Sequence, residues 1–122
     1  IIPLCLRIME TGNELSRTVA IFIVQKILLD NIGLAYVCQT YERFHAVVSV
    51  LNAMIIQLQE QKSLRLLKHI IRCYLRLTDN KKALEGLKQI LPASLRDNTF
   101  KVLISEDSNT TKFYEDLISR LS

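Results

Sequence analysis

Apolar residues recur along most of this chain with the spacing of α-helices, and short polar clusters separate the apolar segments. The clearest segment runs from residue 41 to about Glu60, directly after Thr40, whose side chain can cap a helix. Its apolar residues follow the i, i+3, i+4, i+7 spacing that places side chains on one helix face; they are Phe44, Val47, Val48, Leu51, Ile55 and Leu58. The pattern predicts a long amphipathic helix.

The same spacing predicts helices over most of the chain. Asn13 and Ser63, like Thr40, precede apolar segments and carry side chains that cap helices. The expected helices cover Pro3–Thr11, Glu14–Leu29, Leu34–Cys38, residues 41–60, the segment between Ser63 and Thr78, Lys81–Leu91, Ala93–Arg96, Asn98–Ile104 and Thr110–Leu121. Asp30-Asn31 and Gly33 are expected to interrupt the pattern before the third helix. Glu14–Leu29 is apolar on almost every face, which is typical of a helix surrounded by other helices.

These helices indicate one all-α domain over residues 1–122. The chain has only 3 Gly and 2 Pro and lacks the turn pairs of β-hairpins. A short helix followed by two longer ones recurs at roughly the 40-residue period of armadillo and HEAT arrays, although a globular helix bundle would give a similar pattern. No apolar run approaches the roughly 18 residues of a membrane span, and the N-terminal residues do not resemble a signal peptide.

Charge and cysteine content say less about function. The net charge of +4 favours anionic partners but is common in proteins that bind no nucleic acid. The three cysteines, Cys5, Cys38 and Cys73, are odd in number and widely spaced within apolar segments. This arrangement predicts reduced, buried thiols in an intracellular protein and no disulfide.

The sequence contains no motif of an enzyme or of a metal site. A Gly-rich phosphate loop, a nucleophile elbow, a paired-carboxylate motif and a zinc-binding His or Cys pattern are all missing. Cys73 lies one helical turn from His69, so a Cys–His nucleophile pair is formally possible. Because Cys73 lies beside the apolar face of its helix, we favour a structural thiol. We therefore expect no catalysis, no metal and no cofactor.

A basic stripe runs along the helix that follows Ser63, on the side opposite its apolar face. It consists of Arg65, Lys68, His69, Arg72 and Arg76, which recur at helical spacing. Such a row can contact phosphates or an acidic protein surface. A solvated helix face gives the same pattern, so spacing alone leaves both interpretations open.

The start of the long helix is a second candidate site. Tyr41 and Arg43 lie there in the sequence Tyr-Glu-Arg-Phe, and both residue types are frequent hot spots of protein interfaces. The alternative is that Phe44 belongs to the core while Tyr41 and Arg43 only cover the turn.

Several of these segments resemble the required-for-cell-differentiation family, the armadillo-repeat subunit of the Ccr-Not deadenylase complex. The similar segments are Leu4–Glu10, Val24–Asp30, Cys38–Phe44, Arg65–His69 and Arg72–Leu77. The resemblance extends from the first residue to about Leu121 and covers the C-terminal half of the usual family domain. It implies stacked three-helix armadillo repeats that form part of a longer array. An array beginning at Ile1 would expose an apolar face that a preceding repeat normally covers, so we expect self-association or poor solubility.

The resemblance also implies a function. Such a chain is expected to be a non-catalytic adaptor that binds the Not scaffold subunit and recruits silencing factors, including Gly-Trp repeat proteins, to messenger RNAs. The outcome would be deadenylation, decay and translational repression in the cytoplasm, including mRNA-processing bodies, with the nucleus as a further location. Direct nucleic-acid binding through the basic stripe is the alternative. A purely structural scaffold is a third hypothesis, favoured if Tyr41 and Arg65 are buried and internally paired.

For the family's tryptophan-binding pockets, the resemblance suggests Tyr41 and Arg43, with Lys82 across the next turn. The family more often has a Pro-Arg pair where this chain has Lys81-Lys82. Lysine keeps the charge but loses the planar stacking surface, so we expect weaker tryptophan binding or a different partner. Arg65 lies in a closely matching segment and is the first candidate for a nucleic-acid or scaffold contact.

Overall fold

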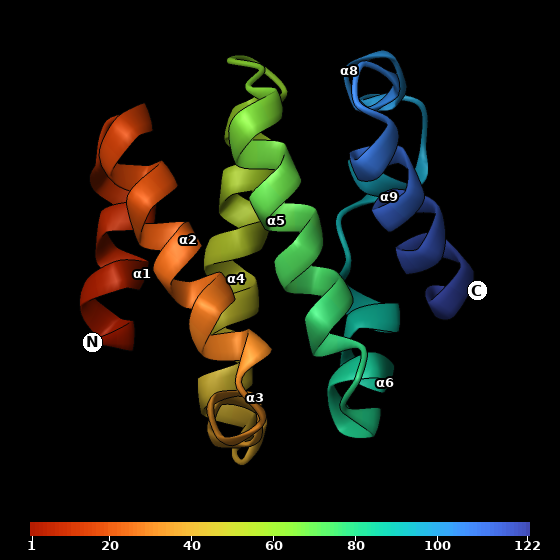
Figure 1. The fold of residues 1–122 in the computed structure, drawn as a ribbon. Coiled ribbons are helices and arrows are strands. Elements are labelled where there is room, and N and C mark those ends of the chain that lie inside the picture. Colours follow the sequence, from red (N-terminus) through yellow and green to blue (C-terminus); the bar gives the residue numbers. More distant parts are fainter.

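The computed structural model describes residues 1–122 as nine α-helices without a strand (Figure 1). In chain order the helices are α1 (Ile2–Thr11), α2 (Glu14–Leu29), α3 (Asn31–Cys38), α4 (Tyr41–Leu58), α5 (Leu64–Leu77), α6 (Lys81–Ile90), α7 (Ala93–Arg96), α8 (Lys101–Ser105) and α9 (Ser108–Leu121). The predicted all-α class is confirmed.

Polar side chains fix where most of these helices begin. Thr40 Oγ1 accepts a hydrogen bond from Arg43 N at 3.2 Å, and the side chains of Asn13, Asp30, Ser63, Asn80 and Asp107 cap their helices in the same way. The expected interruption at Gly33 is wrong. Asp30 Oδ2 accepts from Gly33 N at 3.0 Å, so α3 begins at Asn31 and contains the glycine.

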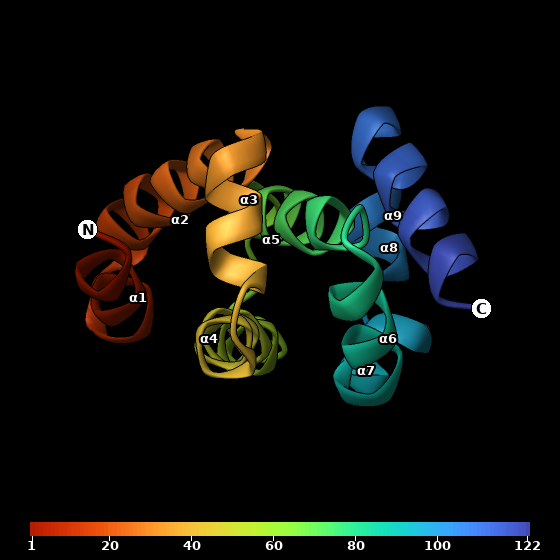
Figure 2. The same cartoon turned by 90° about the horizontal axis from the view of Figure 1, so that it is seen from below.

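The helices form two layers (Figures 1 and 2). One layer contains α2, α5 and α9, with α5 packed between the other two. The other contains α1, α4, α6 and α7, while the short helix α3 links the end of α2 to the start of α4 (Figure 2). The unit of a short helix and two longer ones, seen in α3, α4 and α5, is the predicted armadillo-type element. This architecture is an all-α repeat solenoid.

The core lies between the two layers and is almost entirely apolar. Leu51 and Ile55 of α4 and Leu67 of α5 are fully buried. One polar group is accommodated among them by hydrogen bonds, since Asn52 accepts from the Tyr74 hydroxyl and donates to Ile90 O at 3.1 Å. This contact connects α4, α5 and α6.

The expectation that α2 is enclosed on every side is wrong. Its inner side packs on α1 and α5, but the opposite side leaves large apolar residues in contact with solvent. Leu15 is 68% exposed and Val19 53%, and with Ile1 and Leu4 of the α1 region they line an apolar cavity of about 490 Å³. We call these four residues the apolar end face. No single helix is long and apolar enough to cross a membrane, and α2 with α3 reaches that length only as a pair bent by 99°.

Candidate functional site

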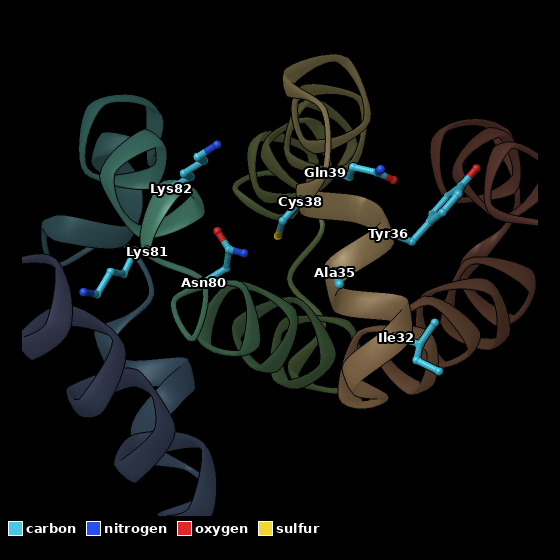
Figure 3. Close-up of a pocket in the computed structure, with 8 residues that line it drawn as sticks. All are labelled: Ile32, Ala35, Tyr36, Cys38, Gln39, Asn80, Lys81 and Lys82. Atoms are coloured by element: carbon cyan, nitrogen blue, oxygen red, sulfur yellow. The ribbon is translucent and has the colours of Figure 1, made fainter.

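A cavity of about 700 Å³ lies where the end of α3 faces the start of α6 (Figure 3). We call it the junction cavity; its lining residues are Ile32, Ala35, Tyr36, Cys38, Gln39, Asn80, Lys81 and Lys82. In Figure 3, Asn80 and Cys38 point toward each other across the opening, and Lys82 extends toward the α3–α4 turn. Lys81 also lines the cavity, but its ammonium group points away from Cys38 in this view.

A smaller pocket of about 220 Å³ adjoins the junction cavity between α4 and α6. We call it the side pocket; it is lined by Cys38, Gln39, Thr40, Tyr41, Phe44, Lys82, Ala83 and Gly86. Cys38, Gln39 and Lys82 belong to both cavities. Its volume lies below the roughly 300–1,000 Å³ of pockets that take drug-sized ligands, and it suits a single side chain.

Two helix starts build the walls of the side pocket. Thr40 caps α4, so Tyr41 occupies the first helical position and remains 70% exposed. Asn80 caps α6 through a hydrogen bond from Ala83 N at 3.1 Å, which places Lys82 in the first turn. The Tyr41 ring lies 6.4 Å, between ring centroids, from the buried ring of Phe44. An exposed aromatic edge and an ammonium group therefore share one small pocket.

The pocket also depends on the absence of a side chain at Gly86. A Cβ atom at this position would lie 2.9 Å from Cε2 of Phe44, closer than a real Cβ contact. Phe44 is buried, so its ring has little room to move. Gly86 thus lets the Phe44 ring pack directly against the backbone of α6.

Arg43 lines neither cavity but supports the wall of the junction cavity. Its guanidinium carbon lies 3.9 Å from the centroid of the Tyr36 ring. Arg43 Nη1 donates to Gln39 Oε1 at 2.9 Å and to Tyr36 O at 3.3 Å. The structure therefore brings Tyr41 and Lys82 to one pocket and places Arg43 behind two lining residues of the neighbouring cavity.

Four residues of the basic stripe line a shallow cavity of about 340 Å³ on α5, namely Arg65, Lys68, His69 and Arg72. Arg65 is exposed and forms no ion pair, whereas Lys68 Nζ lies 3.8 Å from Asp107 Oδ2. Arg72 is exposed, with its guanidinium carbon 5.0 Å from the centroid of the Phe113 ring on α9. Cationic groups and an aromatic ring thus lie together on this face.

His69 is half-buried between α5 and α2. Its Nδ1 lies 2.7 Å from Gln25 Oε1, and its ring meets the Phe22 ring edge-on at 5.7 Å between centroids. Burial lowers the pKa of His69, and the positive charges of Arg72 and neighbouring basic residues lower it further. The imidazole is therefore held neutral at neutral pH.

Arg76, the last residue of the stripe, is occupied by contacts within the fold. Its Nε donates to Leu28 O at 2.7 Å and its Nη2 to Leu29 O at 3.1 Å, which satisfies the last carbonyls of α2. Its Nη1 pairs with Asp79 Oδ2 at 2.8 Å, and Arg120 Nη1 of α9 reaches the other oxygen of Asp79 at 2.8 Å. The structure thus joins α2, α5 and α9 through Arg76.

The cysteines and the potential metal ligands form no reactive or metal-binding site. All three cysteines are free; Cys73 is completely buried, and burial raises its pKa to about 12. Burial also raises the pKa of the half-buried Cys38, although the charge of Arg76 partly opposes the effect. No group of three or more His, Cys, Asp or Glu side chains is placed to hold a metal ion.

Sequence reasoning did not identify Tyr36, Gly86 or Phe113 as parts of these surfaces. Tyr36 and Gly86 lie inside helices, and only the packing of α3 and α4 against α6 brings them to the cavities. Phe113 reaches the basic stripe because α9 packs along α5. The one local signal was the polar turn Gln39-Thr40, which marks the start of a helix beside the cavities.

Comparison with known proteins identifies a matching family and similar proteins in two organisms. The Rcd1-like cell differentiation family matches residues 1–121. The chain is 62% identical over 122 residues to the cell differentiation protein rcd1 of Schizosaccharomyces pombe, covering the whole chain and 43% of that protein. It is 54% identical over 123 residues to Protein CAF40 of Saccharomyces cerevisiae, covering the whole chain and 33% of that protein. The chain thus spans less than half the length of either relative.

Proposed function

This chain belongs to the Rcd1-like cell differentiation family, and we propose that it is a non-catalytic adaptor of the Ccr-Not deadenylase complex. In this role it binds the Not scaffold subunit and recruits silencing factors, such as Gly-Trp repeat proteins, to messenger RNAs. Recruitment leads to deadenylation, decay and translational repression in the cytoplasm, including mRNA-processing bodies, and the nucleus is a further location of the protein.

The observation that carries this proposal is the side pocket beside the junction cavity. Tyr41 is 70% exposed at its rim, and Phe44 supplies an apolar wall. A tryptophan side chain needs an apolar slot with an open polar edge for its indole N–H. Lys82 at the rim can lie over such a ring in a cation–π contact. The pocket therefore fits one aromatic anchor from a flexible partner.

The surroundings of Cys73 and His69, the Cys–His pair considered as a nucleophile, support the proposal that the adaptor is non-catalytic. Cys73 is completely buried with a pKa raised to about 12, so its thiol remains protonated at neutral pH. The Nδ1 atom of its helical neighbour His69 lies beside Gln25 on α2. A recruitment role needs neither group to react.

A binding experiment tests the adaptor role. The chain would be assayed separately with the central region of the Not scaffold and with a Gly-Trp peptide, as wild type and as Tyr41→Ala. We expect the scaffold to be retained by both proteins and the peptide to be lost, by about tenfold or more, from the variant. Ile56→Ala, an exposed apolar position on the same helix, serves as control and should bind like wild type. A folded chain that binds neither partner would contradict the proposal.

A second function, direct nucleic-acid binding, is favoured by the arrangement on α5. Arg65 is free of internal pairing, and Arg72 stands over the Phe113 ring. Positive charge beside aromatic rings is the usual surface for single-stranded nucleic acid. This function predicts RNA binding that falls steeply with salt and is lost in Arg65→Glu, whereas the tryptophan pocket should show little salt dependence.

A further inference from the structure

We propose that the junction cavity and side pocket together bind a segment in which an aromatic residue is flanked by an acidic residue. The inference rests on the adaptor function above and names the chemistry of the partner more closely. In this arrangement the aromatic side chain fills the side pocket, and the neighbouring carboxylate lies in the junction cavity beside Lys82.

The two cavities adjoin each other, as the binding of such a segment requires. They share Cys38, Gln39 and Lys82, so adjacent residues of one peptide can reach both. The side pocket is bounded by Tyr41 and Phe44 and suits an apolar ring. The junction cavity is about three times larger, at about 700 Å³ against about 220 Å³, and has room for backbone and a polar side chain.

The only charged residues that line the two cavities are Lys81 and Lys82, and both are positive; Glu42, in the first turn of α4, lines neither cavity. No carboxylate lines either cavity, and the first turn of α6 contains no acidic residue. Lys82 is exposed and forms no ion pair within the protein; the nearest acidic residue along α6, Glu85, lies 3.4 Å from Lys88 Nζ instead. Lys82 is therefore free to receive an external carboxylate.

Asn80 adds a second donor. Its Oδ1 is used to cap α6, but its Nδ2 donates to no group of the protein. In Figure 3 the Asn80 side chain points into the opening toward Cys38. Asn80 and Lys82 both come from the start of α6, so the cavity offers an amide N–H and an ammonium group as donors to a carboxylate. Arg43 holds the opposite wall through its contacts with Gln39 and the Tyr36 ring.

The test compares three labelled peptides that differ only in the two residues on each side of one tryptophan, which are Gly-Ser, acidic or basic. Binding to the chain would be measured by fluorescence anisotropy at about 0.05 M and about 0.3 M salt. We expect the acidic peptide to bind about three- to tenfold more tightly than the Gly-Ser peptide at low salt, and the basic peptide more weakly. The preference should shrink at high salt.

Two substitutions that each remove one positive charge test whether the preference for the acidic peptide depends on Lys82. Lys82→Gln should weaken both peptides, because it also removes the cation–π contact, and it should abolish the preference for the acidic peptide over the Gly-Ser peptide. Lys101→Gln on α8 should leave that preference unchanged. Equal binding of the acidic and Gly-Ser peptides to wild type would overturn the inference and leave the adaptor function standing. An undiminished preference in Lys82→Gln would overturn the assignment to this cavity. If the Gly-Ser peptide does not bind wild type at all, the tryptophan pocket itself is wrong.

Discussion

Arg65 and Arg76 lie on the same stripe of α5, yet their surroundings give them different tasks. Arg65 is exposed at the start of the helix and has no partner within the protein. Arg76 donates to Leu28 O, Leu29 O and Asn31 Oδ1 and pairs with Asp79, with only 18% of its side chain exposed. Removing Arg76 takes away the side-chain donor to the carbonyls of Leu28, which is buried, and Leu29, whereas removing Arg65 breaks no hydrogen bond within the protein.

We therefore expect Arg76→Met to lower the free energy of unfolding by about 2–3 kcal/mol, the scale of losing hydrogen bonds to a charged group. Arg65→Gln should change it by less than about 0.5 kcal/mol, as is usual for a surface substitution. Urea denaturation of the two variants, followed by circular dichroism, measures both values. Equal stability of the two variants would show that the Arg76 contacts contribute nothing measurable.

Asp79 makes the stability of this cluster depend on pH. Partial burial alone would raise the pKa of Asp79, but the hydrogen bonds from Arg76 and Arg120 outweigh it and lower the pKa below its usual value. The folded state thus holds the carboxylate charged where the unfolded state already binds a proton. The stabilisation that the charged Asp79 contributes is complete above about 3.9, the pKa of aspartate in the unfolded state. It is lost as the pH falls through the lower pKa of Asp79 in the folded state.

Accordingly, the urea midpoint of the wild type should fall as the pH is lowered from about 5 to about 3. Asp79→Asn should be less stable at neutral pH but lose less on acidification, because its side chain cannot titrate. Asp107, whose pKa is lowered by hydrogen bonds from Thr110, provides a comparison on another helix start. A parallel pH dependence in wild type and Asp79→Asn would exclude this carboxylate as a contributor.

At the scale of elements, the helices could be predicted from the sequence because most of their starts are determined by a capping residue next to the helix. The bounds of α2 and α7 agree with the prediction, since a cap or a proline directly precedes each. The start of α3 differs from the prediction because Asp30 caps the helix, so that Gly33 lies inside it and does not break it. The cavities could be predicted only in part, because Tyr41 and Lys82 mark helix starts whereas Tyr36 and Gly86 depend on how distant helices pack.

Gly33 also shows why glycine is required inside α3. A Cβ atom there would lie 2.0 Å from Ile27 O, so α3 could not approach the end of α2 as it does. Gly33→Ala should therefore destabilise the protein by about 1–3 kcal/mol through overpacking, although alanine favours helices. Ala35→Gly, at an exposed position of the same helix, should cost no more than about 1 kcal/mol. Thermal unfolding of both variants measures these changes in stability, and a stabilised Gly33→Ala protein would contradict the observed packing.

On the scale of the whole molecule, the two layers separate the candidate surfaces. The basic stripe lies on α5, in the layer with α2 and α9, whereas the side pocket lies between α4 and α6 of the other layer (Figure 2). A protein partner at the pocket need not cover the stripe, so the two proposed binding functions are separable by substitution. The apolar end face lies on α1 and α2, apart from both surfaces.

This end face leads to a prediction about association. Leu15 and Val19 are more than half exposed, and contiguous apolar surface of this kind favours contact with another apolar surface. In sedimentation velocity we expect the mass of the wild-type chain to rise above 14.1 kDa with concentration, and Leu15→Lys to remain at that mass. Val102→Lys replaces an apolar residue that is 78% exposed on α8, and it should associate like wild type because it leaves the end face intact. If the wild type stays at 14.1 kDa at every concentration, or if both variants lose association equally, the end face does not drive self-association.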